Sequence, residues 1–195
     1  MSILLDLLGA LMIASLLMLM MISFQFQLQD IANRTMFSAQ MMVHEQEACE
    51  DLNRLVALVG IGVAPDSTVS TATATSATFR TRWSYVTNQM LLSPTTLQLT
   101  LEAATASGRR LRIVQGPTVV NDLANILWIE DLAFVYYDKA GALVALPTTA
   151  TTIKTIRSMD VNMTFMRRSP RANKTPLRTR VSLRIYFMNC FLQGG

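Results

Sequence analysis

The chain has 195 residues, of which 51% are hydrophobic and 15% are charged, with a formal net charge of +4. Most of the apolar excess lies in the first quarter, and the remaining residues, about 135, are enough for one domain with its own core. There is no Ser/His/Asp, Cys/His or C-x-x-C arrangement and no glycine-rich phosphate loop. The composition therefore favours a membrane-anchored protein and offers no candidate residues for catalysis or for a cofactor.

Residues 3–26, ILLDLLGALMIASLLMLMMISFQF, are almost wholly apolar, and Asp6 is their only charged residue. The 23 residues between Asp6 and Asp30 carry no formal charge, and about 20 such residues suffice for a helix to cross a bilayer. A secretory signal peptide would show a basic start, a shorter apolar run and a small-residue cleavage site. None of these is present, so the segment is expected to remain in the protein and to span a membrane.

The helical pattern continues beyond this apolar run. No proline occurs before Pro65 and no glycine occurs between Gly9 and Gly60, while apolar residues recur at roughly the spacing of one helical face as far as Val59. We predict one helix from residue 3 to about residue 59, roughly 80 Å long. We expect its residues 1–28 to form a projecting apolar half, its residues 29–59 an amphipathic half, and residues 60–195 a head domain.

Beyond Gly60 the pattern changes to that of β-strands. A Thr/Ser/Ala stretch at 67–78 is either a loop or an edge strand, and apolar residues then alternate with polar ones in several segments. Strands are predicted at 79–85, 96–101, 109–114, 127–137, 142–146, 155–166 and 178–187. Ser107-Gly108 and the sequence at 138–141 indicate hairpin turns. The predicted fold is α+β, with an antiparallel sheet covered on one face by the amphipathic half of the helix.

These segments resemble the type IV pilin superfamily, which includes the pseudopilins of type II secretion. The start SILLDLLGALMIASLL is similar to that family's FTLIELLVVIAIIGIL. The second half resembles J-type pseudopilins and W-type minor pilins. Their F-x-Y-x-D-x-x-G is similar to residues 134–141, their I-R-x-I-x-V-x-L-T-V strand to residues 153–165, and their final V-x-L-R-N to residues 181–184. The resemblance covers nearly the whole chain and implies a filament subunit.

The resemblance also implies a role for Asp6, which takes the place of the family's glutamate. Burial of its carboxylate among the packed helices of a filament core would be unfavourable unless the carboxylate meets a cation. In the family that cation is the free N-terminal amine of a neighbouring subunit, here expected at Met1 or, if Met1 is removed, at Ser2. A plain signal anchor with Asp6 in the headgroup region is the alternative. The chain departs from the family pattern in having no leader ending in glycine and no proline near position 22.

Two further sets of residues are candidate sites. Cys49 and Cys190 are the only cysteines, and in an exported protein they are candidates for a disulfide, with two separate buried thiols as the equally favoured alternative. The loop RRSPRANKTPLRTR carries a candidate basic contact patch, made of Arg167, Arg168, Arg171, Lys174, Arg178 and Arg180. A solvated loop, or one that meets acidic helix residues of a neighbour, is favoured over nucleic-acid binding, because no aromatic residue interleaves the cations.

The leading hypothesis is therefore a structural subunit of a type IV pilus-like extracellular filament, held in the inner membrane before assembly and partnered by copies of itself. A minor, tip-initiating pseudopilin that joins other minor pilins is the second hypothesis. A monomeric, membrane-anchored binding domain is the third. The sequence does not distinguish adhesion, motility, secretion and DNA uptake as the purpose of such a filament.

Overall fold

The computed structural model describes residues 2–105, 108–122, 128–167 and 175–193. These residues form two compact units, one of residues 1–42 and one of residues 43–195. The boundary falls within the long helix α1 (Ser2–Ala57), whose last turns therefore belong to the second unit. The helix predicted from residue 3 to about 59 is confirmed, and it ends two residues earlier than expected.

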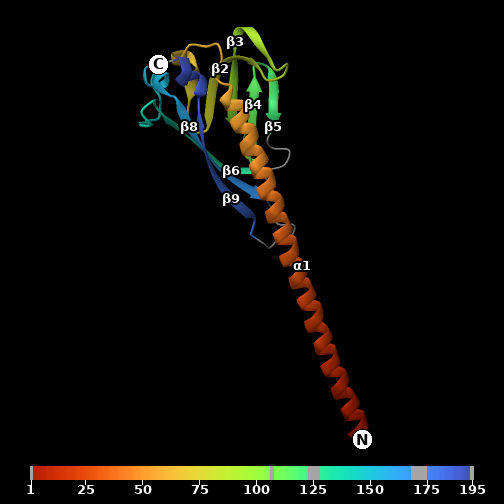
Figure 1. The fold of residues 1–195 in the computed structure, drawn as a ribbon. Coiled ribbons are helices and arrows are strands. Elements are labelled where there is room, and N and C mark those ends of the chain that lie inside the picture. The colour runs from red at the N-terminus through yellow and green to blue at the C-terminus, as the bar shows by residue number, and fades with distance from the viewer. Residues whose placement is uncertain (1, 106–107, 123–127, 168–174, 194–195) are drawn as a thin grey trace. The chain divides into compact units, whose positions relative to one another are not determined.

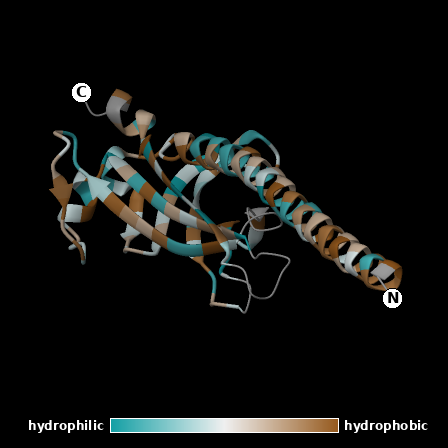
Figure 2. Ribbon diagram, turned by 90° about the horizontal axis from the view of Figure 1, so that it is seen from below, coloured by the Kyte–Doolittle hydropathy of each residue, from teal (hydrophilic) through white to brown (hydrophobic). Residues whose placement is uncertain are grey.

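The first unit consists of the N-terminal part of α1. The large apolar side chains of its residues 3–28 are exposed, and the most apolar 18-residue window of the helix has a mean hydropathy of 2.4 with none of its residues buried. In Figure 2 this part of the helix is a run of mostly apolar turns. α1 is the one described helix that is long and apolar enough to cross a membrane.

The second unit contains two antiparallel sheets, shown in Figure 1. The five-stranded sheet has the order β1 (Val69–Ala72), β2 (Ser76–Ser84), β3 (Gln89–Leu101), β4 (Leu111–Gln115) and β5 (Thr118–Asp122). The four-stranded sheet has the order β7 (Leu143–Val144), β6 (Trp128–Tyr137), β8 (Ser158–Arg167) and β9 (Leu177–Tyr186). Two short 3-10 helices, η1 (Pro65–Ser67) and η2 (Thr152–Thr155), and the helix α2 (Met188–Gln193) complete it.

The expected α+β fold is confirmed, and the strands divide between two sheets where the sequence indicates one. The sheets meet where the backbones of Arg109 and Ile129 exchange hydrogen bonds of 2.9 Å, and where the N–H of Phe134 donates to the carbonyl of Ala74 at 2.8 Å. Local alternation predicts most of the strands but not which hairpins share a ladder, because that is decided by packing between distant segments.

The core of the second unit joins α1 to both sheets. Leu52, Val56 and Val59 at the end of the helix are fully buried, and the rings of Phe79 on β2 and Phe187 after β9 meet edge to face at 5.2 Å. The alternation predicted for the last strand is confirmed, since Ile185 and Phe187 are buried while their polar neighbours are exposed.

Candidate functional site

The apolar surface of the first unit is the most prominent candidate functional feature. Along residues 3–28 the large apolar side chains are between 39% and 84% exposed. Soluble proteins rarely leave so much contiguous apolar surface in water, because transferring it to an apolar surrounding is favourable. This segment is therefore suited to burial in lipid or against other apolar helices.

Asp6 lies near the start of this surface, where its side chain is exposed. Met1, the expected donor of the partner amine, lies outside the described residues. The predicted contact joins two different copies of the chain, so it stays a prediction.

The C-terminal end of α1 is fastened to the rest of the second unit by three side chains. The last carbonyls of a helix have no partner within the helix. Here the hydroxyl of Tyr85 donates to the carbonyl of Leu55 at 2.5 Å, and that of Thr81 donates to the carbonyl of Leu58 at 2.9 Å. Asn189 Nδ2 donates to the carbonyls of residues 57 and 59, both at 3.0 Å.

Thr81 lies on β2, Tyr85 in the turn that follows β2, and Asn189 on α2, so segments far apart in the sequence hold the same helix end. Burial raises the pKa of Tyr85, so its hydroxyl stays protonated and remains a donor at physiological pH. The sequence carries no sign of this arrangement, because Tyr85 and Asn189 lie about 30 and 130 residues from the carbonyls that they bind.

The family-like motif at residues 134–141 forms the end of β6 and the turn that follows. Phe134 and Tyr136 are buried, and the hydroxyl of Tyr136 donates to the carbonyl of Thr73 at 2.9 Å. Asp138 accepts the N–H of Ala142 at 2.8 Å, and Gly141 has a φ of +80°. Each motif residue therefore has a structural role: the rings fill the core, the carboxylate holds the turn, and glycine takes a backbone conformation that other residues rarely adopt.

Comparison with solved structures finds a protein of similar fold. A type IV-like pilin from Thermus thermophilus matches with a TM-score of 0.50 and 8% sequence identity, over 77% of this chain and 96% of that protein. The chain has the fold of a type IV-like pilin. No protein-family model and no curated protein matches its sequence. At this low identity the likeness concerns the fold.

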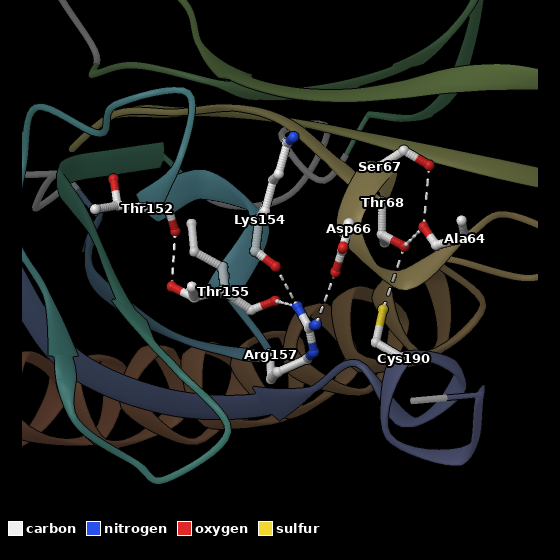
Figure 3. A network of polar contacts seen from close by, with 10 residues as sticks. Ala64, Asp66, Ser67, Thr68, Thr152, Lys154, Thr155, Arg157 and Cys190 are labelled. Atoms are coloured by element: carbon white, nitrogen blue, oxygen red, sulfur yellow. Dashed lines mark hydrogen bonds and ion pairs between the residues drawn. The ribbon is translucent and has the colours of Figure 1, made fainter. Parts of the chain in front are cut away.

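In this pilin-like fold the two cysteines are not joined. Cys49 is half-buried on α1, whereas Cys190 lies on α2, one element beyond the strand on which the sequence placed it. The Cys190 thiol is buried and donates to Thr68 Oγ1 at 3.3 Å, as Figure 3 shows. Burial raises the pKa of both thiols, which disfavours the reactive thiolate. The disulfide between them stays a prediction.

The candidate basic patch is only partly described in the pilin-like head. Arg168, Arg171 and Lys174 lie outside the described residues, and Arg167 and Arg178 belong to β8 and β9. Arg178 binds Glu130 through two hydrogen bonds of 2.6 and 2.7 Å, while Arg180 is exposed. A guanidinium held by a carboxylate in this way is less available to a phosphate, so the described part of the patch favours the solvated reading.

The described residues contain no group of three or more His, Cys, Asp or Glu side chains that could hold a metal ion. His44, the single histidine, lies on α1 with its Nδ1 3.3 Å from Glu47 Oε2, one turn along the same helix. This is an ordinary helix-surface pair.

Proposed function

We propose that this chain is a structural, non-enzymatic subunit of a type IV pilus-like filament that polymerises through its N-terminal apolar helix. The observation that carries the proposal is the exposed apolar surface of residues 3–28 in a chain with a pilin-like fold. Burying such a surface against neighbouring helices is favourable by about 25 cal/mol per Å². A regular lateral array of identical helices would bury it along the whole segment.

Each part of the chain would have its own role in the filament. Residues 1–28 would lie in the inner membrane before assembly and in the filament core afterwards. Residues 29–59 would connect this segment to the head domain of residues 60–195, which would form the outer surface of an extracellular filament. Transfer from lipid to helix contacts keeps the same apolar surface out of water in both states.

Asp6 would set the axial register between neighbours. A carboxylate in the filament core needs a cation, and the terminal amine of Met1, or of Ser2 after its removal, is the group that the pilin-like organisation supplies. One pair per subunit at a fixed place would favour a single stagger of the helices over all others.

The test compares three forms of the full chain: wild type, Asp6→Ala and Asp6→Glu. Asp6→Ala should still insert into the membrane, because it removes a charge from an apolar segment, but the filament fraction should fall about tenfold or more. Asp6→Glu keeps the carboxylate and should assemble like the wild type. Filaments sheared from cells are quantified against membrane-inserted protein. Normal filament yield from Asp6→Ala would refute the pairing.

The second candidate is a minor, tip-initiating pseudopilin, and the motif at residues 134–141 favours it because the pattern resembles those of J-type pseudopilins and W-type minor pilins. Negative-stain microscopy of the purified chain separates the two candidates. A major subunit should form long fibres alone, whereas a tip subunit should appear only in a small complex with other minor subunits. A monomeric anchored domain would give neither.

A further inference from the structure

A groove runs along the outer edge of the five-stranded sheet in the head. One wall is the edge strand β1 with the residues just before it, and the other is the segment 147–154, which leads into η2. The groove has a volume of about 510 Å³, within the range of sites that hold small molecules. It lies wholly within the second unit and has no part in the helix surface discussed above.

The two walls are tied together by side chains. The hydroxyl of Thr148 donates to the carbonyl of Ala72 at 3.2 Å. Arg157, which also donates to the carbonyl of Lys154 at 2.6 Å, pairs with Asp66 at 3.3 Å, as Figure 3 shows. The groove is therefore a fixed feature of the fold, because contacts on both walls set its width.

The charge of the groove is positive. Arg80 and Lys154 both line it, both are exposed, and neither has an ion-pair partner among the described residues. Among the described residues that line it, Asp66 is the only acidic one, and its carboxylate is paired with Arg157. Two available cations beside a neutralised acid attract an anionic group.

Several of the residues that line the groove carry a hydroxyl group. Six of the described residues that line the groove carry one: Ser67, Ser70, Thr71, Thr73, Thr148 and Thr149. Thr71 on the edge strand β1 is exposed, so its hydroxyl can both donate to and accept from a ligand hydroxyl in the groove.

We propose that this groove binds an anionic sugar, meaning a sugar ring that carries a carboxylate or a phosphate. Arg80 and Lys154 would hold the acidic group, and Thr71 and the other hydroxyl residues of the lining would bind the ring hydroxyls. Val69, Pro147 and Ile153 offer apolar surface for the C–H face of the ring. The described lining has no aromatic residue for a nucleobase to stack on, which favours a sugar over a nucleotide.

The test titrates the full chain, kept in detergent micelles, with four probes. Digalacturonate carries carboxylates, glucose 6-phosphate carries a phosphate, galactobiose is a neutral sugar, and inorganic phosphate is an anion without a ring. Calorimetry should show at least one charged sugar binding saturably and about tenfold tighter than both galactobiose and inorganic phosphate. The stronger of the two charged sugars identifies the acidic group.

Variants locate the binding. Replacing both cations, Arg80→Gln with Lys154→Gln, should weaken the charged sugar about tenfold or more, and Thr71→Val should weaken it about threefold. The matched control, Arg109→Gln with Arg180→Gln, removes two exposed cations elsewhere and should leave the affinity within about twofold. The proposal fails if the groove variants bind like wild type, if the control loses as much affinity, or if neutral sugar or phosphate binds as tightly. Thermal unfolding verifies that each variant is folded.

Discussion

Glu45 is the acidic residue whose surroundings differ most from water. It lies on α1 within the second unit and outside the predicted membrane-spanning segment. Its side chain is 6% exposed, and its Oε1 has no hydrogen-bond partner in the structure. Burial raises the pKa of this carboxyl above its ordinary value, because leaving water disfavours the charged form.

This shift has a definite consequence for stability. A carboxyl whose pKa is higher in the folded protein than in the unfolded chain binds protons more tightly when folded, so folding stability falls as the pH rises above the ordinary pKa. Glu45→Gln removes that titration while keeping the shape of the side chain. We expect the variant to be about 1 kcal/mol more stable than wild type at neutral pH, with the difference shrinking toward pH 4.

Thermal unfolding between pH 4 and pH 8 measures this difference. Glu50→Gln is the control, because Glu50 is an exposed acid on the same helix, and its effect should stay below about 0.5 kcal/mol at every pH. A stability gain from Glu45→Gln that did not change with pH would mean that the charge of Glu45 is not its cause.

At the scale of elements, the end of α1 shows how a long helix can be held by a small head. Tyr85, Thr81 and Asn189 bind carbonyls at the end of α1 and in the two residues that follow it, which have no partner within the helix. Tyr85→Phe removes one hydroxyl and leaves the half-buried ring in place. We expect it to destabilise the head by about 1–2 kcal/mol, because the carbonyl of Leu55 loses its partner. Tyr186→Phe, on the exposed side of β9, should cost less than about 0.5 kcal/mol.

Hydrogen exchange locates this effect. Amides of residues 55–63 should exchange faster in Tyr85→Phe, while those in the centre of β8 should change only by the global loss of stability. Uniform acceleration across the whole head would show that the Tyr85 hydroxyl does not fasten the helix end in particular.

The exposed face of the four-stranded sheet carries a second polar cluster. Asp160 on β8 accepts hydrogen bonds of 2.6 and 2.9 Å from Arg184 on β9 and one of 2.8 Å from the Tyr137 hydroxyl on β6. Arg184 also lies over the Tyr137 ring, 4.2 Å from its centre. Hydrogen bonding by Arg184 lowers the pKa of Asp160, so the carboxylate links three adjacent strands in its charged form.

Asp160→Asn should therefore weaken the sheet in a pH-dependent way. A carboxyl with a lowered folded-state pKa stabilises the fold above its ordinary pKa and loses that contribution as the pH falls through the folded value. Because Arg184 is 45% exposed, we expect a cost of only about 1 kcal/mol at pH 7, and this cost should shrink as the pH falls below the ordinary pKa of the carboxyl. Glu130→Gln breaks the more exposed Arg178 pair and should cost less. Urea unfolding at pH 3 and pH 7 would contradict the assignment if the cost were equal at both.

At the scale of the whole molecule, the sequence predicts what depends on local pattern. The uninterrupted apolar run and the absence of proline before Pro65 predict α1, and the alternation around Ile185 and Phe187 predicts β9. The Ser/Thr stretch proves to contain the edge strand β1, which the sequence left open against a loop. β5 was not predicted, because its five residues, TVVND, carry no clear alternation.

The sequence predicts less of what depends on contacts between distant segments. The division into two sheets, the fastening of α1 by Asn189 and the groove beside β1 all bring together residues separated by dozens of positions. The burial of Glu45 cannot be predicted from the sequence either, because the pattern does not distinguish Glu45 from the other acidic residues of the helix. Asp6 stands out in the sequence because a single charge in an apolar run needs no tertiary information to be noticed.

The two compact units give the last prediction. The second unit has its own core, which contains the final turns of α1 and both sheets, whereas the large apolar side chains of residues 3–28 are exposed. Deleting residues 1–28 should therefore leave a folded, soluble, monomeric domain rich in β-structure, because the deletion removes exposed apolar surface and no core residue. Circular dichroism should show the β-content, size exclusion a monomer, and electron microscopy no fibres. If the truncated chain still polymerised, the head would carry assembly, and a filament built on the N-terminal helix would be refuted.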